Sequence, residues 1–226
     1  MNNFLDNKAL FIDFDSTFVK VETIDELAKL SLKNDSNLDI KVKMISDITS
    51  QAMSGKLDFP SALDKRLSIL SLTKSDIIKV NKQISALISD SIQDNIEIIK
   101  SISSSIWILS GGFTEVIHPI VSKFGIKEDR ILANTFTYNH DIITGCNKSN
   151  DLFKKNGKVK AIKQLNLKKD IIMIGDGYTD YEVYKNGVAK TFICYTENIS
   201  RKNVIAESPH IANNFNEVLN IIKKIS

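Results

Sequence analysis

The feature that most constrains this chain is the segment Ala9–Thr17, in which an apolar run opens directly into two aspartates and two hydroxyl residues. An apolar run of this kind is typical of a strand buried on both faces of a parallel sheet. Ligands of such sheets bind at the carboxyl ends of the strands, which is where Asp13 and Asp15 fall. Because alternate residues of an extended strand point the same way, we expect both carboxylates to face one small ligand. Two carboxylates that close repel each other, so the segment predicts a cation or a shared proton between them.

Strand candidates recur along the chain with helical patterns between them, which predicts an α/β fold with a Rossmann-like, mainly parallel sheet flanked by helices. A turn-like sequence at residues 139–141 lies between two β-like runs in the stretch from Ile131 to Cys146. We expect a hairpin there, near the site or on one flank of the sheet. The candidate strands are Lys8 to Phe14, Ser105 to Leu109, Ile131 to Tyr138, Asp170 to Ile174 and Val188 to Ile193.

The connection between the first two strands, about 90 residues, is far longer than a parallel crossover requires. It shows apolar residues at helical spacing and predicts a helical cap inserted after the first strand. We expect an α/β core formed by residues 1–17 and 90–226, and a cap domain formed by residues 18–89 above the strand ends. The expected helices are Glu22 to Leu32, Asp39 to Met53, Pro60 to Leu72 and Ser75 to Ile88, with Ser91 to Ser101 returning to the sheet.

Composition excludes several classes of function. The 226 residues carry 30 basic and 27 acidic side chains, an excess too small to predict nucleic acid binding. Cys146 and Cys194 are too few and too far apart for a disulfide framework or a structural zinc site. No run approaches the ~18 apolar residues of a membrane helix, and the segment Met1–Asp6 lacks the pattern of a secretory signal. We expect a cytoplasmic protein with no membrane partner, either a monomer or a homodimer.

A second acidic segment follows the apolar run at residues 171–174. Glycines separate Asp176 and Asp180 and let the backbone turn sharply. With Asp13 and Asp15 they place four carboxylates at the ends of two strands. Hard oxygen ligands of this kind suit Mg²⁺, which binds through few carboxylates, waters and a substrate phosphate. No His or Cys is adjacent, so zinc is not expected.

Two further segments favour an anionic ligand. The strand at residues 106–109 ends in Ser110 and two glycines before a helix, which predicts an anion cradle of hydroxyl and backbone N–H groups. Lys158 begins an amphipathic helix and can place its charge on a phosphoryl oxygen, with Lys160 as the competing candidate. Each piece alone is common, because such a serine is usually part of a turn and such a lysine is usually solvated. Their occurrence together, each at a strand end or a helix start, indicates phosphate chemistry.

At these residues the sequence resembles the haloacid dehalogenase-like phosphatases, and within them it is most similar to the phosphoserine phosphatases. The resemblance covers most of the chain. It implies an enzyme that uses Mg²⁺ to hydrolyse a small phosphate ester, L-phosphoserine, to L-serine and phosphate. The matching segments are Asp13–Thr17, Ser110–Gly112, Lys158 and Gly175–Asp180, then Glu22–Ala28, Ala52–Leu67 and the stretch from Phe192 onward.

The resemblance assigns the four carboxylates separate roles. Asp13 is the expected nucleophile, which forms an aspartyl-phosphate, and Asp15 the expected general acid and then general base. Mg²⁺ is expected on Asp13, on the backbone carbonyl of Asp15 and on Asp176. Asp180 is expected to position metal-bound waters or Lys158.

The resemblance also implies the substrate contacts. Ser110, Gly111 and Lys158 are expected to hold the phosphoryl oxygens. Glu22 is expected to bind the substrate ammonium and Arg66 its carboxylate, because an arginine fork binds two oxygens at once. The remaining expected contacts are Met53 and Phe59 from the cap and Thr179. Without the resemblance, the alternative interpretation is that Glu22 and Arg66 are ordinary charges on helix surfaces. Met53 and Phe59 would then be residues of the apolar core.

Several alternatives stay open at this point. Tyr178 occupies a position that is usually small in these phosphatases, so its phenol is expected to narrow the pocket or to bond the substrate. The same mechanism also suits another small phosphorylated metabolite, or phosphotransfer to a second alcohol. A non-enzymatic receiver domain shares the acids, hydroxyl and lysine, but the long cap and Asp15 argue against it. We expect His118 and His140 to be structural or solvated.

Overall fold

The computed structural model describes residues 5–225, which leaves Met1–Phe4 of the amino-terminal segment considered above, and Ser226, outside the described part. Its main sheet is six-stranded and parallel, as predicted. The strands lie in the order β3 (Ile131–Asn134), β2 (Ile106–Phe113), β1 (Lys8–Ile12), β6 (Asp170–Gly175), β7 (Thr191–Tyr195) and β8 (His210–Ala212). Within residues 5–225 no helix is both long and apolar enough to cross a membrane.

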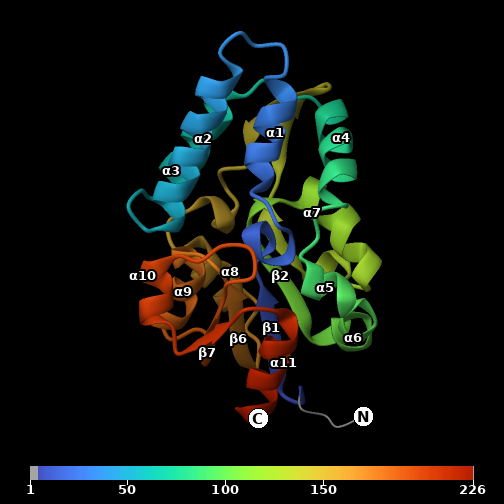
Figure 1. Cartoon of the computed structure of the whole chain (residues 1–226), viewed down its shortest axis with the longest axis vertical. Coiled ribbons are helices and arrows are strands. Elements are labelled where there is room, and N and C mark those ends of the chain that lie inside the picture. Colours follow the sequence, from blue (N-terminus) through green and yellow to red (C-terminus); the bar gives the residue numbers. More distant parts are fainter. Residues whose placement is uncertain (1–4, 226) are drawn as a thin grey trace.

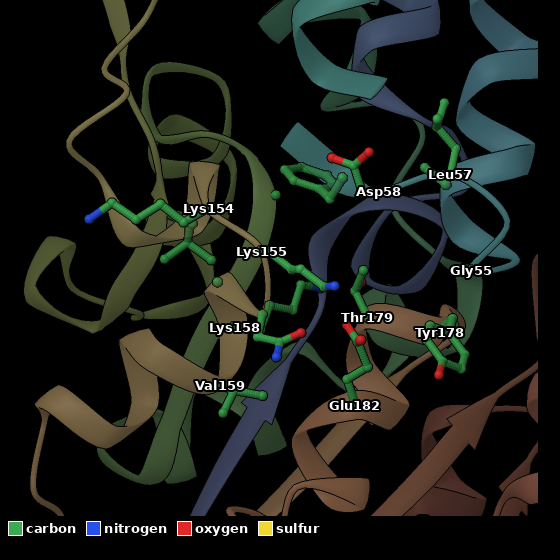
Figure 2. A pocket seen from close by; sticks show the side chains of 16 residues that line it. Gly55, Leu57, Asp58, Lys154, Lys155, Lys158, Val159, Tyr178, Thr179 and Glu182 are labelled. Carbon is green, nitrogen blue, oxygen red and sulfur yellow. The ribbon is translucent and has the colours of Figure 1, made fainter. Parts of the chain in front are cut away.

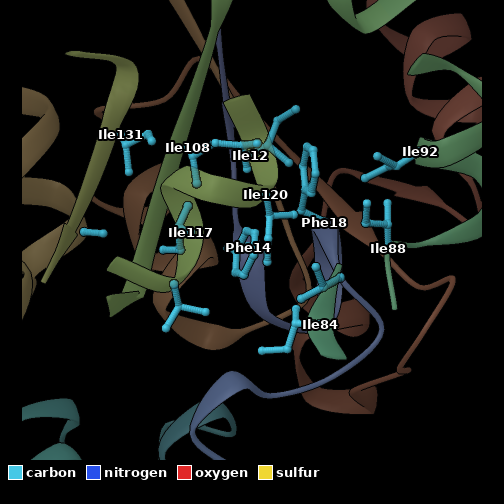
Figure 3. Packing of buried hydrophobic residues seen from close by; sticks show 14 of the residues in the cluster. Ile12, Phe14, Phe18, Ile84, Ile88, Ile92, Ile108, Ile117, Ile120 and Ile131 are labelled. Atoms are coloured by element: carbon cyan, nitrogen blue, oxygen red, sulfur yellow. The ribbon is translucent and has the colours of Figure 1, made fainter. Parts of the chain in front are cut away.

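Helices cover both faces of this sheet because the strand residues alternate between two apolar clusters. In β1, Leu10 and Ile12 belong to one cluster, and Ala9 and Phe11 belong to the other. Figure 3 shows the first cluster, in which Ile12 and Phe14 pack with residues of the covering helices. That face carries α5 (Asp90–Asp94), α6 (Ile96–Ile102), α7 (Thr114–Val121) and α11 (Phe215–Lys224), and the other carries α8 (Gly157–Gln164), α9 (Tyr178–Lys185) and α10 (Lys202–Glu207).

The strand order reverses at β1, which pairs with β2 on one side and with β6 on the other. Such a switch point leaves a crevice beyond the carboxyl ends of the two central strands, where ligands of open α/β sheets bind. The backbone N–H of Asp13, directly after β1, donates to the carbonyl of Ile174 in β6 at 2.9 Å. The two acidic segments are therefore joined side by side at this crevice.

Four helices stand above the strand ends (Figure 1): α1 (Thr23–Ser31), α2 (Leu38–Met53), α3 (Phe59–Ile69) and α4 (Lys74–Ile84). The hairpin of β4 (Phe136–Asn139) and β5 (Ile142–Cys146) reaches up to them, and Ile143 N donates to Leu72 O at 2.9 Å. Val19 and Ile88 pair where the chain leaves and re-enters the core. We propose that the cap is the segment 18–89 between these two crossings.

Besides shifted strand ends, the structure differs from the sequence predictions as follows. The predicted single strand Ile131–Tyr138 is wrong: it breaks at Thr135, because β3 joins the main sheet while β4 pairs with β5 in a separate hairpin. The predicted helix over residues 91–101 divides into α5 and α6, since the Asn95 side chain bonds back to the carbonyl of Ser91. The short edge strand β8 was not predicted.

Candidate active site

Asp13, Lys158 and Asp180 form a buried charged group at the crevice. The ammonium of Lys158 lies 2.8 Å from Asp13 Oδ1 and 2.6 Å from Asp180 Oδ1. Burial opposes the lysine charge, but the two carboxylates outweigh it and raise the pKa of Lys158. The Asp13 Oδ1 atom also accepts a bond from the N–H of Phe14 at 2.8 Å. The α8 lysine therefore carries a proton while it contacts the first aspartate of the chain's acidic pair.

Asp13, Asp176 and Asp180 form a compact acidic cluster, with one oxygen from each lying within 4.8 Å of the others. Burial, together with the charge of Asp13, raises the pKa of Asp180 well above its ordinary value. Gly175 is required beside them, since a Cβ there would lie 2.3 Å from Asp180 Oδ2. Three buried carboxylates that repel one another are a donor set that fits a hard divalent cation such as Mg²⁺.

Asp15 lies beyond the strand, in a kinked turn at residues 14–18 in which Ser16 has a φ of 54°. The expected alternation along an extended strand is wrong, because β1 ends at Ile12. The carboxylate still reaches the same cavity as Asp13, held by the N–H of Thr23, which donates to Asp15 Oδ1 at 2.8 Å. Burial and the charge of Asp13 raise the pKa of Asp15 to about 7. A carboxyl with that pKa can release or take up a proton near neutrality.

The end of β2 contributes a hydroxyl and two glycines. Ser110 is fully buried, and its Oγ accepts a bond from Gly112 N at 2.9 Å. The amide of Asn134 in the neighbouring strand β3 donates to Gly111 O at 2.9 Å, which holds this end of β2 in place. Ser110, Gly111, Gly112 and Lys158 all line one cavity, as expected for a hydroxyl, backbone and lysine site for an anion.

These groups line one small inner cavity of about 30 Å³, enough for only a few waters. Apart from Tyr178, all the residues predicted to touch the substrate line this cavity. Asp176 and Asp180 lie behind it, in contact with Thr17 and Lys158 respectively. The predicted residues that line it are Asp13, Asp15, Glu22, Met53, Phe59, Arg66, Ser110, Gly111, Lys158 and Thr179.

Glu22 is part of a network that sequence reasoning missed. Its Oε1 accepts bonds from Ser16 Oγ at 2.8 Å and from Arg201 Nη2 at 3.3 Å. The same Arg201 guanidinium donates through Nε to Asp176 Oδ2 at 2.8 Å. Burial, followed by the charge of Asp15, raises the pKa of Glu22 to about 8. Arg201 thus links the acidic cluster to the residue expected to bind the substrate ammonium.

Arg66 is a buried cation that faces the cavity from α3. It is 3% exposed, and burial lowers the pKa of its guanidinium. Its Nε donates to Ala62 O at 3.2 Å, and its Nη1 donates to Thr49 Oγ1 at 3.1 Å. Among residues 5–225 it makes no ion pair with a carboxylate. A buried guanidinium that lines a cavity and lacks such a pair is complementary to an anionic ligand group.

Tyr178 lies farther from the acidic cluster than the other predicted contacts, at an outer pocket. Its ring is absent from the lining of the inner cavity and instead forms part of a second, outer pocket of about 290 Å³. Figure 2 shows this pocket, with Tyr178 and Gly55 on one side and Lys158 on the other. The phenol therefore contacts the cap rather than narrowing the inner cavity.

The remaining candidates lie away from the cavity. His118 is in α7 next to Pro119, and His140 is in the β4–β5 turn. Lys160 is exposed on α8, whereas Lys158 two residues earlier is buried. The structure thus separates the two lysines that the sequence left in competition.

Comparison with known proteins agrees with this geometry. Residues 7–187 match the family model described as haloacid dehalogenase-like hydrolase. A phosphoserine phosphatase of Methanocaldococcus jannaschii is 31% identical over 83% of this chain and 85% of its own. The crystal structure of a phosphoserine phosphohydrolase-like protein from Francisella tularensis superposes with a TM-score of 0.85 at 34% identity, over 95% of this chain and 99% of that chain. A phospho-aspartyl intermediate analogue of phosphoserine phosphatase gives a TM-score of 0.76 at 25% identity, over 95% and 98%.

Proposed function

Because this chain belongs to the haloacid dehalogenase-like hydrolases, we propose that it is a Mg²⁺-dependent phosphatase that converts L-phosphoserine to L-serine and phosphate. The observation that carries the substrate is the buried Arg66, which faces the inner cavity without a carboxylate partner among the described residues. L-Phosphoserine bears a phosphate, a carboxylate and an ammonium. The cavity offers Lys158 with Ser110 for the first, Arg66 for the second and Glu22 for the third.

In the proposed reaction a carboxylate oxygen of Asp13 attacks phosphorus, and the bond from phosphorus to the serine oxygen breaks. Asp15, protonated near neutrality, gives its proton to the departing serine oxygen. The ionised Asp15 then takes a proton from water, which attacks the aspartyl-phosphate and releases phosphate from Asp13. Ser110 and Lys158 bind the phosphoryl oxygens throughout.

The acidic cluster supports a Mg²⁺ site. Asp13, Asp176 and the backbone carbonyl of Asp15 would hold the ion, and Asp180 would hold Lys158, as their contact indicates. When bound, the ion neutralises charge between the anionic phosphate and the carboxylates. The guanidinium of Arg201 already offsets the negative charge of Asp176.

Replacing Arg66 by Ala tests the substrate assignment. If Arg66 binds the substrate carboxylate, its loss removes a charged hydrogen bond and raises the KM for L-phosphoserine by about 30-fold or more. The KM for a phosphate ester that has no carboxylate, such as phosphoethanolamine, should change much less. Steady-state phosphate release on both esters measures this difference.

Lys65→Ala is the matched control, since Lys65 is an exposed cation on the same helix. It should leave both KM values unchanged. Equal losses on the two esters in Arg66→Ala would show that Arg66 serves the cap structure rather than the carboxylate. The substrate would then be another phosphate ester handled by the same catalytic groups.

The raised pKa of Glu22 makes a prediction about stability. An acid whose pKa is raised to about 8 on folding stabilises the fold below its unfolded pKa, and this stability is lost as pH rises through the folded value. In the presence of a chelator, the Tm of the wild-type protein should therefore fall between about pH 5 and about pH 9. Glu22→Gln should make that decline shallower, although Asp15, Asp176 and Asp180 still contribute to it.

Differential scanning fluorimetry across this pH range measures the slope. Glu26→Gln, in the helix α1 that directly follows Glu22 and paired with Lys29, controls for the loss of one charge. Parallel curves for the wild type and Glu22→Gln would contradict the burial of an ionisable Glu22.

A further inference from the structure

The loop Ser54–Asp58, which joins α2 to α3, rests on the core beside the acidic cluster. The side chain of Asn203 in α10 donates to Ser54 O at 3.0 Å. The next residue, Gly55, lies directly against the ring of Tyr178, the first residue of α9. Figure 2 shows these two residues adjacent at the edge of the outer pocket.

The contact between Gly55 and Tyr178 is close enough to exclude any side chain at position 55. A Cβ there would lie 2.9 Å from Tyr178 Cδ1, and the φ of Gly55, 77°, is itself in the left-handed region that favours glycine. Tyr178 is supported from below by Tyr181, whose ring centroid lies 6.0 Å away, and by Lys185 Nζ, 3.5 Å from its hydroxyl. The Tyr178 ring is thus held by its neighbours in the core and provides the surface on which the cap loop packs.

The packing of the loop on Tyr178 affects the position of two side chains that line the inner cavity. Met53 immediately precedes the loop, and its sulfur lies over Gly177, 3.2 Å from the place of a Cβ. Phe59 immediately follows the loop, and its ring lies against the backbone of Gly111. If the loop moved away from Tyr178, both apolar walls of the cavity would move with it.

The inner cavity holds only about 30 Å³, so a phosphorylated amino acid must displace this wall to enter and let it return before reaction. A contact that forms only when the loop packs against the core then raises the population of the closed conformation, in which the reaction takes place. Tyr178 and Asn203 are two core side chains that make such contacts with residues 55 and 54, respectively.

We propose that Tyr178 is a positioning residue that seats the loop Ser54–Asp58 and thereby holds Met53 and Phe59 over the phosphoryl site. Tyr178 acts through the cap and does not touch the substrate. The kinetic consequence rests on the proposed function, whereas the docking of the loop does not.

The test compares Tyr178→Ala with Tyr178→Phe. Loss of the ring should raise the KM for L-phosphoserine by about tenfold, because the closed conformation of the loop is then less populated in the free enzyme. The kcat should change less than about twofold, because the bound substrate itself stabilises the closed conformation. Tyr178→Phe keeps the ring and should remain within about twofold of the wild type in both constants. Tyr184→Ala removes another tyrosine of α9 and is the matched control.

Hydrogen exchange of the peptide covering residues 51–58 supplies a readout independent of activity. Exchange there should be faster in Tyr178→Ala and unchanged in Tyr178→Phe and Tyr184→Ala. Asn203→Ala should also make exchange of this peptide faster and raise KM, but by less than Tyr178→Ala. If Tyr178→Ala does not fold, Asn203→Ala provides the test of the proposal. Wild-type exchange and KM in both Tyr178→Ala and Asn203→Ala would overturn the proposal. A wild-type enzyme inactive on L-phosphoserine would instead contradict the proposed function and leave the exchange prediction standing.

Discussion

Replacing Asp13 by Asn is expected to lower kcat for phosphate release by about 10⁴-fold or more while the protein remains folded. An amide cannot form the acyl-phosphate, so both chemical steps are lost. Stability should change little, because the negative charge of Asp13 raises the pKa values of Asp15, Asp176 and Asp180 and its removal relieves that repulsion. Lys158 keeps Asp180 as a partner.

Single-turnover assays with thermal unfolding of the same samples measure both parts of this expectation. Asp6→Asn, an exposed aspartate just before β1, is the matched control and should retain full activity. Substantial turnover by a folded Asp13→Asn enzyme would assign the nucleophile elsewhere.

The second large effect is expected for Lys158→Met. Loss of this cation removes the positive charge that would stabilise the phosphoryl oxygens, and kcat should fall by about 10³-fold. It also leaves Asp13 and Asp180 without their shared partner in a buried site, which should cost about 3–5 kcal/mol of stability. The Tm should therefore fall together with activity.

A double variant separates the two consequences. In Lys158→Met/Asp180→Asn one of the two orphaned carboxylates is gone and Asp13 remains, so part of the lost Tm should return while kcat stays low. Lys158→Arg keeps the charge in a different shape and should preserve stability better than activity. Recovery of kcat in the double variant would mean that Lys158 acts only by neutralising Asp180.

The central part of the fold was predictable because its signals are local. Apolar runs ended at Asp13, Ser110 and Asp176, and parallel strands bring their carboxyl ends to one edge. The short strand β8 carries too few residues to show a period, and the break at Thr135 depends on which partner strand each half finds. Pairing partners of that kind are decided by tertiary contacts.

The site was predictable where chemistry restricts the residue type, and unpredictable where the direction of a side chain decides its role. Arg201 lies 25 residues after Asp176 in a loop with no pattern of its own, yet it bridges Asp176 and Glu22. A cation close to the acidic segment in the folded chain leaves no mark in sequence spacing. Tyr178 was noticed for its size, but only the structure shows that it faces Gly55 instead of the cavity.

The central claim is that this cavity recognises a phosphorylated amino acid through Arg66 and Glu22 while Asp13 takes its phosphate. The most direct test is kcat/KM for phosphate release from L-phosphoserine, phosphoethanolamine and glycerol phosphate, with Mg²⁺ and with a chelator. We predict a preference of about 100-fold or more for L-phosphoserine, which matches the loss of one or two charged contacts, and no release with the chelator. Equal kcat/KM values for the three esters, or release that persists with the chelator, would contradict the account.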